Sequence, residues 1–358
     1  MLRTNKKDFW SKITLLVVGI IFIYGMYLRL KGLTPNSLWN DELNQLKVMK
    51  GSFFDLLINL PKNELNSYLN LDHFLIYPFF KFFSYNKIGL AIPHIIAAIF
   101  TFYFLFLNCK RLFKTNFAYV IVFWIFSVNT TLIRHAVEIR PYAVLPGLAL
   151  AVFYFTELLA NNINMTSKKK NAIYIFLFVA ICFHTYGIFI VFVCYAFSVL
   201  SRWKKDFIKM FFTRNIKRLL SMLAIALPYW FYNVLGPLHI DVSVSNYDPF
   251  VFIPSPVTNS IGFLKGVFGT LVGFRLNYLF LPILLVPFIL PYKERFKQII
   301  FFFVLILLSV FLVLVGDLIG GYWFMQRQFI WVMPFFALLL GWIIDSLIFF
   351  VLKKGETA

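Results

Sequence analysis

Residues 299–316 read IIFFFVLILLSVFLVLVG, an apolar stretch without a charged side chain. A helix that crosses a bilayer needs about 20 mostly apolar residues, so this stretch predicts a transmembrane helix. Apolar runs bounded by charge predict ten such helices, at about residues 13–30, 90–108, 117–133, 141–160, 172–185, 187–200, 219–235, 276–291, 299–318 and 329–352. The expected fold class is therefore an all-α integral membrane protein.

The composition of the chain supports a membrane location. Of its 358 residues, 61% are hydrophobic, and its mean hydropathy is +0.80, whereas soluble domains are about 45–50% apolar. No polar block between the runs is long enough for a separate soluble domain, so we expect one transmembrane domain over residues 1–358. The three cysteines, Cys109, Cys182 and Cys194, lie in or beside apolar segments without metal-ligand spacing.

The net charge of +19 is distributed by side of the membrane. Most of the 34 lysines and arginines fall in one set of segments, namely Arg3 to Lys12, Lys110 to Lys114, Lys168 to Lys170, Arg202 to Arg218, Lys293 to Lys297, and Lys353 with Lys354. The positive-inside rule then places both termini in the cytoplasm and predicts a multi-pass protein of the inner (plasma) membrane. Orientation and contact with lipid headgroups account for this charge, so no nucleic-acid partner is expected. The basic N-terminus and the apolar run after it indicate an uncleaved signal anchor.

The larger loops fall on the extracytoplasmic side, at residues 31–89 and 236–275. The segment Leu43 to Leu60 is amphipathic, which is typical of helices that lie on the membrane interface. The cytoplasmic connections are short, and the chain has no glycine-rich phosphate loop followed by Lys-Ser or Lys-Thr. Use of ATP or of a nucleotide sugar is therefore not expected.

Most of the acidic residues also lie outside. The adjacent pair Asp41 and Glu42 follows Trp39 and Asn40 shortly after the first helix. A carboxylate at the membrane surface, partly desolvated by Trp39, could act as a general base toward a hydroxyl. The alternative is a helix N-terminus, with Asn40 or Asp41 as its cap and Glu42 in its first turn.

A second cluster, residues 134–142, reads RHAVEIRPY. Pro141 suits the first turn of a helix whose positive end faces outward, where Arg134 and Arg140 would bind a phosphate. The alternative is a pair between Glu138 and an arginine that only stabilises the loop. Arg327 lies similarly at the outer end of the last helix, among aromatic residues that would otherwise form an interface belt.

Three further polar residues lie at helix ends. His73, which follows Asp72, is a candidate ligand or acid–base group, with a surface hydrogen-bonding residue as the alternative, and the same holds for His184. Asp317, near the outer end of the ninth helix, is a candidate partner for an arginine.

Taken in order, these motifs resemble the membrane glycosyltransferases of the GT-C superfamily, which include protein O-mannosyltransferases and lipid A aminoarabinose transferases. The motifs that carry the resemblance are Arg29-Leu30, SLWNDE at 37–42, DHFLIY at 72–77, EIRPYA at 138–143, HTYG at 184–187, and RQF at 327–329 before Met333-Pro334. Where the family has two prolines after the histidine of the third motif, this chain has Phe74 and Leu75.

The resemblance implies an inverting transfer of a sugar from a polyprenyl-phosphate carrier to an acceptor hydroxyl at the extracytoplasmic face, in glycan biosynthesis of the cell envelope. Asp41 would be the base, with support from Glu42. Substrate-binding residues would be Arg140, Arg134, Arg327, Glu138, His73 and Tyr142. Some members of the family use a divalent cation at this step, but the sequence offers no ligand set for one.

Two other classes of protein are compatible with the topology. A transporter or lipid flippase usually has ionisable groups in the middle of its helices, whereas here Glu157 and Asp345 are the main exceptions and lie toward the cytoplasmic side. A ligase or polymerase of surface polysaccharide would share the outer loop with Arg and His. The acidic pair directly after the first helix favours the transferase, and the sugar and the acceptor are left open.

Overall fold

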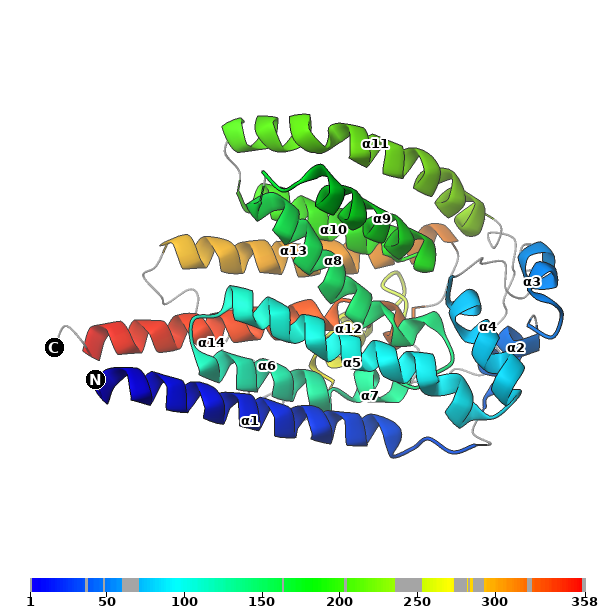
Figure 1. The fold of residues 1–358 in the computed structure, drawn as a ribbon, viewed down its shortest axis with the longest axis horizontal. Coiled ribbons are helices and arrows are strands. Elements are labelled where there is room, and N and C mark those ends of the chain that lie inside the picture. Colours follow the sequence, from blue (N-terminus) through cyan, green and yellow to red (C-terminus); the bar gives the residue numbers. More distant parts are fainter. Residues whose placement is uncertain are drawn as a thin grey trace.

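The computed structural model describes residues 2–35, 38–47, 49–59, 71–162, 164–202, 205–235, 253–273, 282, 284–285, 293–320 and 324–355. In this part of the chain every extended regular element is a helix (Figure 1), which confirms the all-α expectation for these residues. The longer helices form a bundle. The two termini lie at one end of it, and the short helices α2, α3 and α4 lie at the other.

The helices follow one another with short connections. They are α1 (Leu2–Leu30), α2 (Asn40–Lys47), α3 (Phe53–Asn59), α4 (Leu71–Phe83), α5 (Lys87–Leu112), α6 (Asn116–Val128), α7 (Thr130–His135), α8 (Leu145–Asn161), α9 (Ser167–Phe183), α10 (Gly187–Leu200), α11 (Lys205–Leu235), α12 (Ser260–Val272), α13 (Lys293–Gly320) and α14 (Met333–Gly355). Two 3-10 turns, η2 (Pro141–Ala143) and η5 (Gln326–Phe329), precede α8 and α14.

Four of the described helices are long and apolar enough to cross a membrane, and they indicate a membrane protein. Their apolar segments are Ser11–Leu30, Lys87–Leu112, Lys297–Leu318 and Met333–Val351. Two of these helices keep large apolar side chains on the outside. Leu16 of α1 and Leu307 of α13 are each 65% exposed, which is the surface that lipid would cover.

Ten crossings are not confirmed. The helices α6, α8, α10 and α12 are apolar but shorter, and the 13 residues of α6 span only about 20 Å at 1.5 Å per residue. The span expected at 117–133 is divided at Asn129, whose side chain accepts from Leu132 N and so caps the separate helix α7. The span expected at 276–291 lies almost wholly outside the described residues.

The core of the bundle is built around α8. Helices α5 and α10 pack against α8, while α1 and α14 pack against α6. At the centre the ring of Phe153 lies 5.3 Å from that of Phe197 and 5.7 Å from those of Phe302 and Phe335. Such pairs are worth about 0.5–1.5 kcal/mol beyond their buried area, so these contacts hold helices from distant parts of the sequence in one register.

The first outer loop has a small core of its own. The amphipathic segment predicted at Leu43 to Leu60 contains α2 and α3, as expected of helical periodicity, and its last residue lies outside the described residues. The buried apolar side chains of this core are Leu46, Met49, Leu56, Ile76, Phe80, Leu90 and Ile139. They join α2, α3 and α4 to the start of α5 and to the loop before α8, and thereby position the beginning of α2.

The turn between α9 and α10 depends on Gly187. A Cβ at this position would lie 2.0 Å from the carbonyl oxygen of Ala180, which no side chain tolerates. The close approach lets the chain reverse within residues 184–187. It also places His184 and Tyr186 at the same end of the bundle as α2.

Candidate functional site

Three segments from distant parts of the sequence meet at the end of the bundle opposite the termini. They are the first turn of α2, the loop and turn between α7 and α8, and the turn η5 before α14. Each supplies charged side chains to one cluster, which consists of Asp41, Glu138, Arg140, Tyr142 and Arg327.

Asp41 lies between two arginines. Its carboxylate accepts a hydrogen bond of 3.2 Å from Arg327. Arg140 lies 4.0 Å from the same carboxylate oxygen and donates a 3.3 Å hydrogen bond to the backbone carbonyl of Asp41. The side chain of Asp41 keeps 36% of its surface exposed, so a substrate could reach this carboxylate.

Glu42 faces the opposite way and is completely buried. Its carboxylate forms an ion pair with Lys87 at 2.5 and 2.7 Å and accepts hydrogen bonds from the backbone N–H groups of Ile139 at 2.8 Å and Trp39 at 3.2 Å. Glu42 therefore closes the start of α2 and ties it to α5 and to the loop that carries Arg140. The residue positions Asp41 and is not itself open to substrate.

Glu138 and Arg327 form the buried side of the cluster. The carboxylate of Glu138 is hydrogen-bonded to His135 Nδ1 and lies 3.7 Å from Arg327. Burial raises the pKa of Glu138, but the hydrogen bond from His135 and the charges of Arg327 and Arg140 outweigh it, and the net pKa is lowered. Burial lowers the pKa of Arg327, and the neighbouring Tyr142, Glu138 and Asp41 more than compensate. Both groups stay charged at neutral pH.

Aromatic rings form the walls around the arginines. The guanidinium of Arg327 lies 4.9 Å from the ring centre of Tyr142 and 5.8 Å from that of Trp39, and Arg140 lies 5.9 Å from Tyr142. Cation–π contacts of this kind fix the plane of a guanidinium while its outer N–H groups stay available. The Nε atoms of both arginines have no hydrogen-bond partner among the described residues.

The structure thus brings together Asp41, Glu138, Arg140, Tyr142 and Arg327 from the residues predicted from sequence. Arg134 is different, because its side chain is exposed on the last turn of α7, and it has no ion pair among the described residues. His73 is buried on α4 beside Asp72. Asp72 accepts hydrogen bonds from Gln45 at 2.9 Å and shares one of 3.1 Å with His94.

Two contacts differ from the sequence prediction or were missed by it. Asp317 does not pair with an arginine; it accepts a 3.2 Å hydrogen bond from the hydroxyl of Tyr186. Lys87 was not identified from sequence, although a lysine on the expected outer side runs against the positive-inside pattern and was the available signal. The ion pair with Glu42 explains its position.

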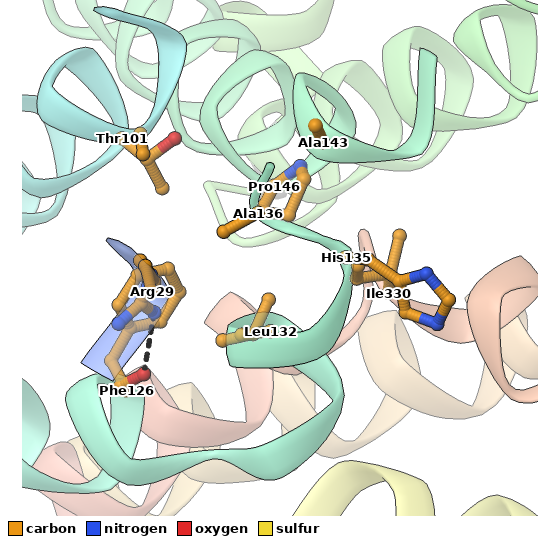
Figure 2. A pocket seen from close by; sticks show the side chains of 10 residues that line it. Arg29, Thr101, Phe126, Leu132, His135, Ala136, Ala143, Pro146 and Ile330 are labelled. Atoms are coloured by element: carbon orange, nitrogen blue, oxygen red, sulfur yellow. Dashed lines mark hydrogen bonds between the residues drawn. The ribbon is translucent and has the colours of Figure 1, made fainter. Parts of the chain in front are cut away.

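Arg29, from the first motif of the family resemblance, lies behind the cluster and is structural. Its guanidinium donates to the carbonyl oxygens of Gly25, Ser127 and Phe126 at 2.8, 3.1 and 3.2 Å. The last two close α6, whose C-terminal carbonyls carry partial negative charge. Figure 2 shows Arg29 bound to Phe126, in a small cavity that His135 also lines. The contact holds the end of α6, from which the chain continues to α7 and the cluster.

Comparison with known proteins does not identify the chain. No protein-family model matches it, and no curated protein is significantly similar. No group of three or more His, Cys, Asp or Glu within the described residues is arranged to hold a metal ion. The functional reading therefore rests on the geometry of the cluster.

Proposed function

We propose that the protein is a membrane glycosyltransferase that transfers a sugar from a polyprenyl-phosphate carrier to an acceptor hydroxyl at the extracytoplasmic face. The observation that carries this proposal is the position of Asp41, a partly exposed carboxylate between Arg140 and Arg327. A candidate base and two candidate phosphate ligands lie within one site, as a phosphate-leaving transfer requires.

The reaction is a single displacement at the anomeric carbon. The acceptor oxygen forms a bond to this carbon while the bond to the carrier phosphate breaks, and the configuration inverts. Asp41 takes the proton of the acceptor hydroxyl, and the electron pair of the broken bond stays on the departing phosphate. Arg140 and Arg327 stabilise the charge that the phosphate gains, which lowers the barrier because they are held in place before the step begins.

Without substrate the arginines and Asp41 neutralise one another. A phosphate group that enters the site competes for the same guanidinium N–H groups, since paired N–H donors bind phosphate and carboxylate alike. Donor binding would therefore draw the arginines from Asp41 and leave its carboxylate free for the acceptor. Glu138 and Tyr142 keep Arg327 oriented during this exchange.

The proposed orientation places this cluster outside the cell, at the membrane surface, and both termini in the cytoplasm of a multi-pass inner membrane protein. It is supported by charge at the other end of the bundle, where Arg202 and Arg111 pair with Glu157 at 2.7 and 3.1 Å. Basic residues concentrate on the cytoplasmic side. The same pairing weakens the transporter alternative, since Glu157 lies at a helix end with two arginine partners.

The experiment is a comparison of the envelope lipids and glycans of cells that carry the wild-type gene, no gene, or the Asp41→Asn variant. We expect cells without the gene and cells with the variant to accumulate the same sugar-loaded polyprenyl phosphate and to lack the same glycosylated product. Asp55→Asn is a matched control, because Asp55 is an exposed acidic residue of the same loop that only caps α3 through Ser52. An unchanged carrier pool in cells without the gene would refute the proposal.

A further inference from the structure

A second carboxylate lies next to the arginine cluster without a complete set of partners. Asp317, in the last turn of α13, is 3% exposed. Its Oδ1 accepts the hydrogen bond from Tyr186, whereas its Oδ2 has no hydrogen-bond partner among the described residues. A buried carboxylate oxygen without a partner costs roughly 1–3 kcal/mol or more, which a bound group that donates a hydrogen bond would offset.

A line of aromatic contacts joins Asp317 to the arginine cluster. The ring of Tyr186 lies 4.9 Å from that of His184, and His184 lies 5.3 Å from Tyr142, which packs on Arg327. Burial and the charge of Asp317 raise the pKa of Tyr186, while the charge of Arg327 acts in the opposite direction. The phenol is therefore within the electrostatic reach of both groups.

The arrangement of polar and apolar atoms fits a sugar better than a second anion. A carboxylate would repel another phosphate, so the side of the site at Asp317 does not suit the carrier's charged group. Sugars instead present hydroxyl donors, and protein sites recognise them through carboxylates and through rings that cover their apolar faces. The rings of Tyr142, His184 and Tyr186 lie between Asp317 and the arginines.

We propose that Asp317, oriented by Tyr186, accepts a hydrogen bond from a hydroxyl of the transferred sugar and so contributes to the choice of donor. This inference rests on the proposed function, because it takes the sugar to be held beside a phosphate bound at Arg140 and Arg327. It assigns Asp317 to substrate recognition and Tyr186 to the positioning of that carboxylate.

The test is direct binding of two probes to the purified protein, namely a polyprenyl phosphate and the same lipid loaded with one hexose. The Asp317→Leu variant should bind the sugar-free lipid as the wild type does. Its affinity for the sugar-loaded lipid should fall by about ten- to a hundredfold, as expected for the loss of a hydrogen bond to a charged group. Tyr186→Phe, which removes one hydroxyl and no ring, should change the same ratio in the same direction by a smaller factor.

The control variant is Asp345→Asn. Asp345 is a buried carboxylate on α14 that accepts from the backbone of Lys114 and Thr115 at the far end of the bundle, so its substitution should leave the ratio of the two affinities unchanged. A wild-type ratio in folded Asp317→Leu protein would overturn the inference. A wild-type protein that binds neither lipid would instead refute the proposed function.

Discussion

Arg327 donates a hydrogen bond of 3.2 Å to the carboxylate of Asp41, 286 positions earlier in the chain. The same guanidinium lies 3.7 Å from Glu138 and 4.9 Å from the ring of Tyr142. One arginine therefore connects the first outer loop, the loop before α8 and the start of α14. Each of the following predictions tests a part of this arrangement.

Asp41→Asn should abolish turnover and preserve donor binding. Asparagine has nearly the same shape but cannot take the proton of the acceptor, and a positioned general base contributes about 10²- to 10⁴-fold. The measurement is sugar transfer by purified protein at saturating donor, with Asp55→Asn as the control. Transfer by Asp41→Asn at close to the wild-type rate would show that Asp41 is only part of a helix start, and Glu42→Gln would be measured next.

Arg140→Ala should weaken use of the carrier by about ten- to a hundredfold, because a hydrogen bond to a charged group contributes roughly 1.5–3 kcal/mol. Arg134→Ala is the comparison, since Arg134 is exposed and lies six residues away on α7. Its effect should be much smaller. Equal donor affinity and turnover in both variants would leave Arg140 with a role in loop structure alone.

Lys87→Met should destabilise the protein by about 3–5 kcal/mol, since it leaves the buried carboxylate of Glu42 without its countercharge. The double variant Glu42→Gln with Lys87→Met should recover much of this loss, because glutamine is neutral and still accepts from the backbone. Thermal unfolding in detergent measures both. A double variant less stable than Lys87→Met would contradict this account of the pair.

Glu138 should make the stability of the protein depend on acid. Its pKa in the folded protein is lowered from the ordinary 4.5, so its contribution is complete above about pH 4.5 and is lost as the pH falls through the folded-state value. In Glu138→Gln the decline of the unfolding temperature below pH 4.5 should be shallower than in the wild type. Parallel curves for the two proteins would rule out this contribution.

Single-cysteine labelling should reveal the orientation in the membrane. Arg134→Cys should react with an impermeant thiol reagent in intact cells, and Lys169→Cys should react only after the membrane is opened. Both side chains are exposed, and the native Cys109, Cys182 and Cys194 are buried, which keeps the background low. A reactive Lys169→Cys in intact cells would invert the topology and remove the extracytoplasmic site.

The sequence by itself determined the membrane class, the helical fold and the short list of charged residues outside the long apolar helices. These follow from local composition, because a long apolar stretch and an isolated acidic pair are visible without knowledge of their neighbours. The ends of α6 and α8 were not predictable in this way. They depend on the cap at Asn129 and on the turn at Pro141, which interrupt apolar runs that look continuous.

Only the tertiary structure decided which charged residues act together. The adjacent residues Asp41 and Glu42 point to opposite environments, one toward the arginines and the other into a buried pair with Lys87. Asp317 found a tyrosine in place of the expected arginine. Such partners lie tens to hundreds of positions apart, and the distance between them is set by helix packing in the core, which no local pattern encodes.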